Sequence, residues 1–116
     1  MDNKPGIGTA IPKRRYRFGE FTLTILGDIE STDGTEYRYI MAVVRGQDTE
    51  PGMYITAEKP AGAAGKLLDM RIIMQDGTGI IGQDSGWQQL DAFAARGIAV
   101  VGRVLNLSDE TPWQLL

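Results

Sequence analysis

Apolar side chains recur at helical spacing through residues 84–107, toward the C-terminal end of the chain. At the step of about 100° per residue, one group of them falls within roughly 80°: Trp87, Leu90, Ala94, Ile98, Val101 and Leu105. A second group widens this stripe to about half the circumference: Phe93, Gly97, Val100, Val104 and Leu107. The pattern predicts one long helix that packs on a hydrophobic core.

The apolar arc of this helix is wider than the surface that one sheet usually covers. A second copy of the chain is the simplest partner for the surplus edge, and the alternative is that loops or tails of the same chain cover it. The first alternative predicts a homodimer, and we expect its interface to include the wider part of the arc: Phe93, Gly97, Val100, Val104 and Leu107.

The start of the helix has a clear signal. Ser85 and Gln88 stand at the spacing of a capping box, and Asp84 adds negative charge where the helix dipole favours it. Gly97 is unusual inside a helix, because glycine costs ~1 kcal/mol there relative to alanine. Its place within the apolar arc suggests that another backbone or side chain approaches closely.

The segments before the helix alternate between apolar and polar residues, as half-buried strands do. Asp33-Gly34 and Asp76-Gly77 are strong hairpin signals. The predicted fold class is α+β, an antiparallel meander sheet of about five strands with one long C-terminal helix packed on one face. The expected strands cover residues 18–30, 36–45, 53–58, 67–75 and 79–82.

The chain has 116 residues, which is enough for one domain with a hydrophobic core. Residues 1–12 are rich in glycine and proline and lack periodicity, so we expect a flexible N-terminal tail followed by a single domain over residues 13–116. No apolar run approaches the roughly 20 residues of a membrane span, and the first residues lack the apolar core of a signal peptide. A cytoplasmic location without a membrane partner is therefore expected.

The composition excludes several kinds of chemistry. The chain contains no histidine and no cysteine, which removes disulfides, histidine-based triads, thiol nucleophiles and the usual zinc ligand sets. We accordingly expect no metal, no cofactor and no enzymatic activity. The net charge of −3 argues mildly against bulk attraction to nucleic acid or anionic membranes.

Two local patterns have simpler explanations than catalysis or cofactor binding. Gly77, Gly79 and Gly82 spell a dinucleotide fingerprint, but no helix opens inside it and no parallel strand can follow, so a tight hairpin explains the glycines. Asp69 lies in the middle of an expected strand among apolar residues. A cross-strand or surface partner such as Arg71 explains it better than a catalytic role.

Four basic residues and two aromatic residues cluster within residues 13–18. Such a cluster combines phosphate contacts with stacking surfaces, as single-stranded nucleic acid requires. Strand alternation places Tyr37 and Tyr39 on one face and Arg38 on the other, which divides a continuous patch. The alternative is a strand edge whose positive charge discourages aggregation. The candidate nucleic-acid-binding residues are Lys13, Arg14, Arg15, Tyr16, Arg17, Arg38, Lys66 and Arg71.

Short motifs within residues 53–105 resemble the positive-cofactor-four family of transcriptional coactivators. Leu68-Asp69-Met70-Arg71 is similar to that family's Ile-Asp-Ile-Arg strand, and Gly79-Ile80 to its Gly-Ile entry strand. Trp87 and Leu90 match its Trp-x-x-Leu helix start. The resemblance implies a curved antiparallel sheet, a following helix through which two copies dimerise, and binding of single-stranded DNA.

The chain departs from this family where the family contacts DNA. Met74 occupies the position of an aromatic residue, and the lysine-rich loops are reduced to Lys66. Only Arg71, together with Lys66, carries over as an expected nucleic-acid contact. The resemblance therefore implies a fold and a dimer more strongly than DNA binding.

Three functional hypotheses follow from the sequence. The first is a non-catalytic, homodimeric binding or interaction module, because catalytic side chains are missing and the helix is broadly apolar. The second is single-stranded nucleic-acid binding through the basic N-terminal strand. The third is a small-molecule binding domain, which requires a concave pocket with convergent carboxylates.

Overall fold

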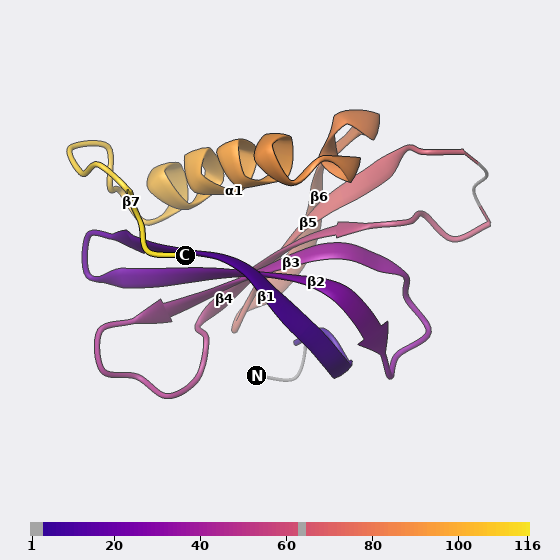
Figure 1. The fold of residues 1–116 in the computed structure, drawn as a ribbon, viewed down its shortest axis with the longest axis horizontal. Coiled ribbons are helices and arrows are strands. Elements are labelled where there is room, and N and C mark those ends of the chain that lie inside the picture. The colour runs from indigo at the N-terminus through magenta and orange to yellow at the C-terminus, as the bar shows by residue number, and fades with distance from the viewer. Residues whose placement is uncertain (1–3, 63–64) are drawn as a thin grey trace.

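The computed structural model describes residues 4–62 and 65–116, and it contains one antiparallel sheet with a helix packed after it (Figure 1). The sheet has seven strands in the order β6-β5-β4-β3-β2-β1-β7, so each strand from β1 to β6 pairs with its neighbour in the chain. The elements are β1 (Ile7–Phe18), β2 (Phe21–Ser31), β3 (Tyr37–Arg45), β4 (Met53–Glu58), β5 (Leu68–Met74), β6 (Gly77–Asp84), the 3₁₀ turn η1 (Ser85–Gln88), α1 (Leu90–Val104) and β7 (Trp113–Gln114).

The α+β class and the meander are confirmed, whereas the expected count of about five strands is wrong. The strands expected in residues 18–82 did not include β1, although its basic residues were assigned to an N-terminal strand edge, and β7 was not expected. Gly8 and Pro12 obscure the periodicity of β1, and its pairing with β2 has three irregularities in register. β7 has two residues, too few to show any alternation.

Part of the expected N-terminal tail belongs to the sheet. Residues 7–12 lie in β1, and Ile7 pairs with Ser31 of β2. Ahead of the strand, the Gly6 N–H donates to Asp33 Oδ2 at 2.8 Å, and the Gly6 carbonyl accepts from the Thr32 N–H at 2.9 Å. The expected tail is therefore shortened, because hydrogen bonds to the β2–β3 loop order this backbone; residues 1–3 lie outside the described residues.

The helix begins differently from the predicted capping box. Asp84 caps η1, since its Oδ1 accepts from the Gly86 N–H at 2.6 Å. Gln88 instead donates from its side chain to the Lys66 carbonyl, and α1 starts at Leu90. At the far end Asn106 takes the left-handed conformation, with φ of 57°. This conformation ends the helix before residue 107, as in many C-terminal caps.

Helix α1 buries its apolar arc against the sheet of its own chain. The predicted core residues Trp87 and Val101 are buried, as expected. Phe93, Gly97 and Val100, three of the expected homodimer residues, are buried as well. They are therefore unavailable to a second copy, because β1 adds Tyr16 and Phe18 to the sheet surface under the helix. Of the remaining two, Leu107 is partly buried and Val104 is exposed.

The two tyrosines of β3 lie on opposite faces of the sheet, contrary to the prediction. Tyr37 pairs with Glu58 and Tyr39 with Ala57, so an irregularity at Arg38 interrupts the alternation. Tyr39 faces α1, where its ring lies 5.4 Å from that of Phe93. Tyr37 faces the side that carries no helix, which we call the helix-free face.

Candidate functional site

The helix-free face of the central strands carries a row of polar side chains. Glu58 of β4 is the register partner of Asp69 in β5, and Thr56 is the partner of Arg71. Directly opposed residues of antiparallel strands share a face, so these four side chains lie next to one another. Alternation along β4 and β5 therefore assembles carboxylates and a guanidinium at one end of the sheet.

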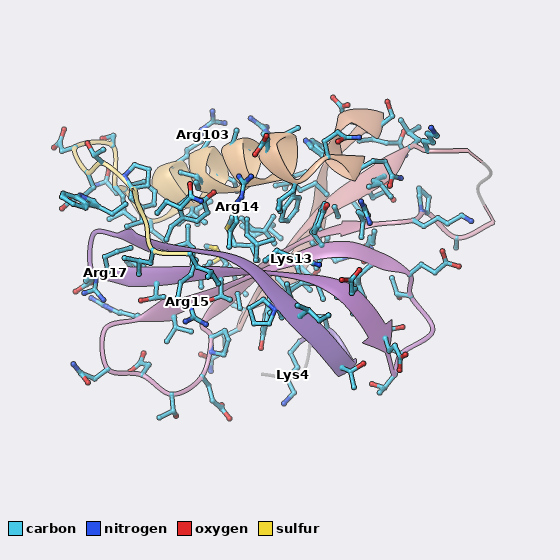
Figure 2. The ribbon with its side chains drawn as sticks, in the orientation of Figure 1. Lys4, Lys13, Arg14, Arg15, Arg17 and Arg103 are labelled. Atoms are coloured by element: carbon cyan, nitrogen blue, oxygen red, sulfur yellow. The ribbon has the colours of Figure 1, made fainter. Side chains whose placement is uncertain are left out.

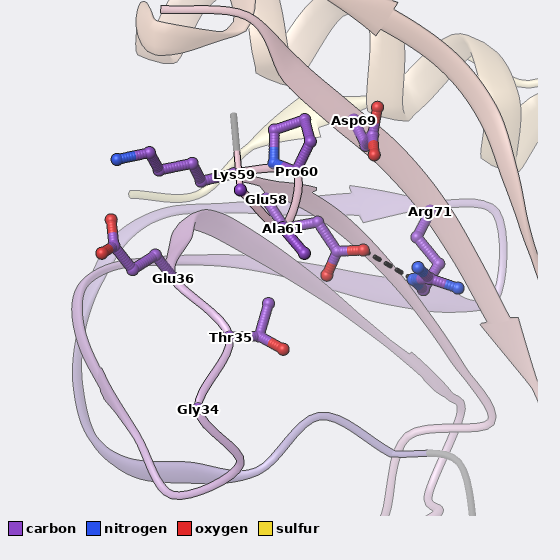
Figure 3. Close-up of a pocket in the computed structure, with 10 residues that line it drawn as sticks. Gly34, Thr35, Glu36, Glu58, Lys59, Pro60, Ala61, Asp69 and Arg71 are labelled. Atoms are coloured by element: carbon purple, nitrogen blue, oxygen red, sulfur yellow. Dashed lines mark hydrogen bonds and ion pairs between the residues drawn. The ribbon is translucent and has the colours of Figure 1, made fainter. Parts of the chain in front are cut away.

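Two loops enclose this end of the sheet and form a pocket of about 530 Å³ (Figure 3). The β2–β3 loop contributes residues 34–36, and the β4–β5 loop contributes residues 59–62. Figure 3 shows Glu36 and Lys59 across the pocket from Arg71. The volume lies within the range of small-molecule sites, roughly 300–1,000 Å³. A concave pocket of the size that the third hypothesis requires is therefore present, and three carboxylate residues are among those that line it.

The pocket is built around an ion pair between Glu58 and Arg71. The Arg71 Nε donates to Glu58 Oε1 at 2.6 Å. The Glu58 side chain is only 7% exposed, whereas the Arg71 side chain is 33% exposed. A buried carboxylate requires such a partner, because an unpaired charge away from water is strongly destabilising. Arg71 thus supplies the charge partner of Glu58 at the base of the pocket.

Several polar groups of this end have capacity left for a ligand. Arg71 has no hydrogen bond from its Nη atoms, and Glu58 none to Oε2, within the described part of the chain. Asp69 accepts from the Gln83 side chain at 2.8 Å, which fixes one carboxylate oxygen. The Thr56 hydroxyl also has no partner among residues 4–62 and 65–116, but it is fully buried and lies outside the pocket lining. The arrangement can therefore hold a molecule that both donates and accepts hydrogen bonds.

A smaller pocket of about 280 Å³ adjoins the first and shares Glu36 and Lys59 with it. Arg38 lines this second pocket, where its Nε donates to the Gln88 carbonyl at 3.0 Å. The Arg38 guanidinium also lies over the Tyr39 ring, 4.8 Å from its centre. Lys66 reaches the same region through the hydrogen bond that its carbonyl accepts from Gln88.

The structure divides the eight predicted nucleic-acid-binding residues between two places. Arg71 lines the first pocket and Arg38 the second, and the Lys66 carbonyl is bonded to Gln88, which also lines the second. The remaining five belong to β1, at the other side of the sheet (Figure 2). The predicted residues therefore do not form one continuous basic surface.

The basic cluster of β1 is itself split between the two faces of the sheet. Figure 2 shows Arg14 on the helix side, where it pairs with Asp91 of α1, and Arg15 and Arg17 on the opposite side. Lys13 pairs with Asp28 at 2.6 Å, and the hydrogen bond from Lys13 lowers the pKa of the Asp28 carboxyl.

The remaining members of the cluster have other contacts. Tyr16 is buried in the core, so its ring cannot stack on a base. Arg15 donates to Thr24 Oγ1 at 3.1 Å, and Arg17 donates to the Gly19 carbonyl at 3.1 Å. Arg15 and Arg17 are the members that have no carboxylate partner in the described part of the chain.

Sequence analysis missed three residues at these sites. Glu58 stands at the end of a strand and shows no sign of burial in the sequence; only its pairing with Asp69 reveals it. Lys59 follows it in an ordinary loop. Trp113, which is 72% exposed, pairs with Arg17 across β1 and β7, and a strand of two residues gives no sequence signal.

Two further features bear on the kind of protein. Among the described residues, no group of three or more acidic, histidine or cysteine side chains is placed to hold a metal ion. No helix in the described ranges is both long and apolar enough to span a membrane.

Comparison with known proteins adds no identification, because no family model, no curated protein and no solved structure matches the chain. The resemblance to the positive-cofactor-four family stays a prediction from its motifs.

Proposed function

We propose that the protein is a small non-catalytic binding module whose ligand site is the pocket around Glu58 and Arg71. One observation carries this proposal: a carboxylate that is 7% exposed lies at the base of an open cavity of about 530 Å³. Ionisable groups of a purely structural surface seldom combine burial, a specific charge partner and a concave setting.

The charges that line the pocket indicate the chemistry of the ligand. Three carboxylates, Glu36, Glu58 and Asp69, face two cations, Lys59 and Arg71, which leaves one net negative charge. Glu58 and Arg71 largely compensate each other, and Lys59 offsets one of the two remaining carboxylates, Glu36 and Asp69. A small polar molecule with an ammonium or guanidinium group, and an acceptor for Arg71, fits this arrangement.

The proposal is tested with a defined set of ligands. We expect thermal-shift and calorimetric titrations to detect binding of a small amine or amino acid from a panel that includes arginine, ornithine, putrescine and glucose. Glucose, which is neutral, should bind least. If none of these molecules binds at millimolar concentration, the proposed class of ligand is wrong.

Two substitutions locate the binding site. Asp69→Asn keeps the shape of the side chain and removes its charge, so we expect it to weaken amine binding roughly tenfold, or about 1.4 kcal/mol. Asp76→Asn makes the same change in the exposed β5–β6 turn, outside the pocket, and should leave affinity unchanged. Equal effects of the two substitutions would place binding elsewhere.

A second candidate function is single-stranded nucleic-acid binding at the β1–β7 edge, and a specific observation favours it. Arg15 and Arg17 are exposed and lack carboxylate partners among the described residues, and Trp113 is paired with Arg17 at this edge. Exposed tryptophan and arginine are the side chains on which unpaired bases stack.

Trp113 provides the readout for this candidate. Trp87 is buried, so quenching of tryptophan fluorescence by oligothymidylate would report on Trp113. Binding that weakens steeply with salt and disappears in Arg15→Gln/Arg17→Gln would support the candidate. No quenching at low salt would exclude it.

A further inference from the structure

The two edges of the sheet are protected to very different degrees. At one edge, β1 carries Pro12, four basic residues and three irregularities of register, and β7 covers part of it. These are the devices by which natural sheets prevent pairing with another chain. The other edge is β6, whose sequence GTGIIGQD contains no proline and no basic residue. β6 therefore lacks the proline and the basic residues of the other edge, and its pairing with β5 has one irregularity of register against three in β1.

β6 also exposes apolar side chains. Ile80 is 48% exposed and Ile81 is 38% exposed. Ile81 stands where the register between β5 and β6 shifts, so it leaves the regular ladder. Alternate residues of an edge strand direct N–H and C=O groups outward, and within the described part of the chain no further strand pairs with them. This edge thus combines unpaired backbone groups with exposed hydrocarbon.

We propose that β6 pairs antiparallel with β6 of a second copy, so that one sheet runs through both molecules. The charges of the strand favour an identical partner. Asp84 is its one charged residue and lies at its end, so two antiparallel copies place their Asp84 side chains at opposite ends of the pair. The two isoleucines of each copy meet near the two-fold axis.

The protection of the β1 edge explains why the proposed association stops at two copies. A head-to-tail contact between β6 of one molecule and β1 of the next would propagate into a filament. The basic residues and irregular register of β1 prevent that contact, whereas pairing of β6 with β6 is closed. The inference does not depend on the pocket. It assigns the homodimer to a surface other than the apolar arc of α1, most of which packs against the sheet of the same chain.

Sedimentation velocity on matched variants tests the proposal. Ile81→Lys places a charge at the proposed interface, and Ile11→Lys makes the same change at the exposed Ile11 of β1. We expect the unmodified protein and Ile11→Lys to be dimers. We expect Ile81→Lys to raise the dimer dissociation constant by roughly a hundredfold. A monomeric unmodified protein, or an unchanged dimer in Ile81→Lys, would overturn the proposal.

Hydrogen exchange on the unmodified protein supplies a test that needs no variant. Dilution below the dissociation constant should increase exchange at alternate amides of residues 77–84 and leave those of β1 unchanged. If dilution instead releases amides of α1, or changes none, the copies do not pair through β6. Circular dichroism of Ile81→Lys checks that its fold is retained.

Discussion

Gly97 of α1 lies directly against the side chain of Met41 in β3. A Cβ at position 97 would come within 2.7 Å of Met41 Cε and 3.2 Å of its Sδ. Met41 is fully buried, so its flexible end must shift within the core to admit that Cβ. The glycine that is unfavourable for the helix in isolation is therefore the residue that lets the helix approach the sheet.

We predict that Gly97→Ala lowers the free energy of unfolding by about 1 kcal/mol. Overpacking costs roughly 1–3 kcal/mol, against a gain in helix propensity of about 1 kcal/mol. In a Met41→Ala background the obstruction is absent, and the same substitution should become neutral or stabilising. Urea denaturation of the four proteins of this double-mutant cycle measures the difference. Equal effects in both backgrounds would show that the contact does not limit the helix.

The buried Thr56 hydroxyl leads to a prediction of increased stability. It has no hydrogen-bond partner within the described ranges, so Thr56→Val removes a polar group at nearly constant volume. We expect a gain of about 1 kcal/mol in the free energy of unfolding. Thr24→Val is the matched control: the Thr24 hydroxyl accepts from Arg15, so this change should not stabilise. Destabilisation by Thr56→Val would indicate that the hydroxyl has a partner.

The Glu58–Arg71 pair should respond asymmetrically to substitution. Arg71→Met leaves a carboxylate that is 7% exposed without its partner, and we expect a loss of about 3 kcal/mol. Glu58→Leu/Arg71→Met removes both charges and should recover most of that loss. Arg45→Met breaks the exposed pair with Glu20 and should cost at most about 1 kcal/mol. Thermal and urea denaturation would show whether the ranking holds, and a small effect of Arg71→Met would contradict the burial of Glu58.

Asp33, in the β2–β3 loop, accepts a hydrogen bond from the Tyr37 hydroxyl at the start of β3. This pair should make the free energy of unfolding depend on pH in both the acidic and the alkaline range. Burial acts to raise the pKa of the Asp33 carboxyl, but hydrogen bonds from the Tyr37 hydroxyl and backbone N–H groups outweigh it and hold that pKa below its ordinary value. Burial and the Asp33 carboxylate raise the pKa of the Tyr37 phenol above its ordinary value.

The signs of these two contributions differ. The stability from Asp33 is complete above its unfolded pKa of about 3.9, and it is lost as pH falls through the lower pKa of the folded state. The stability from Tyr37 is complete below its unfolded pKa of about 10, and it is lost as pH rises above that value.

Urea denaturation across the pH range tests this prediction. Asp33→Asn should abolish the pH dependence of the free energy of unfolding that Asp33 causes at acidic pH, and it should reduce the dependence that Tyr37 causes at alkaline pH. Tyr37→Phe should abolish the dependence that Tyr37 causes at alkaline pH. Burial also raises the pKa of Tyr54, so Tyr54 should keep its own contribution to stability at alkaline pH in both variants. Unchanged pH profiles in the variants would show that the hydrogen bond between these side chains is not formed in solution.

The helix and the meander could be predicted from the sequence because their signals are local. The spacing of Trp87 and Val101 indicates which side of one helix is buried, and each Asp-Gly pair lies at or next to one hairpin turn. β1 could not be predicted as far as Ile7, since its order depends on bonds to Asp33 in a distant loop. A partner distant in the sequence leaves no periodicity in the segment that it orders.

The candidate site was largely beyond prediction for the same reason. Asp69 stood out as a polar residue in mid-strand, but the burial of Glu58 follows from the register between β4 and β5. One irregularity at Arg38 moved Tyr37 and Tyr39 to opposite faces, and strict alternation cannot anticipate such a shift. Side chains that meet across strands depend on register, which the order of residues in one strand does not specify.

The short pairing of Trp113 and Gln114 with β1 has a consequence for how the chain folds. Every pairing from β1 to β6 joins consecutive segments, whereas this one closes a loop of nearly the whole chain. Closure of long loops is entropically unfavourable and slow. We therefore expect the hairpins to form first and β7 to pair with β1 after the rate-limiting step. Because such a pairing is absent from the transition state, it slows unfolding and does not accelerate folding. Its residues would then govern how long the native molecule persists.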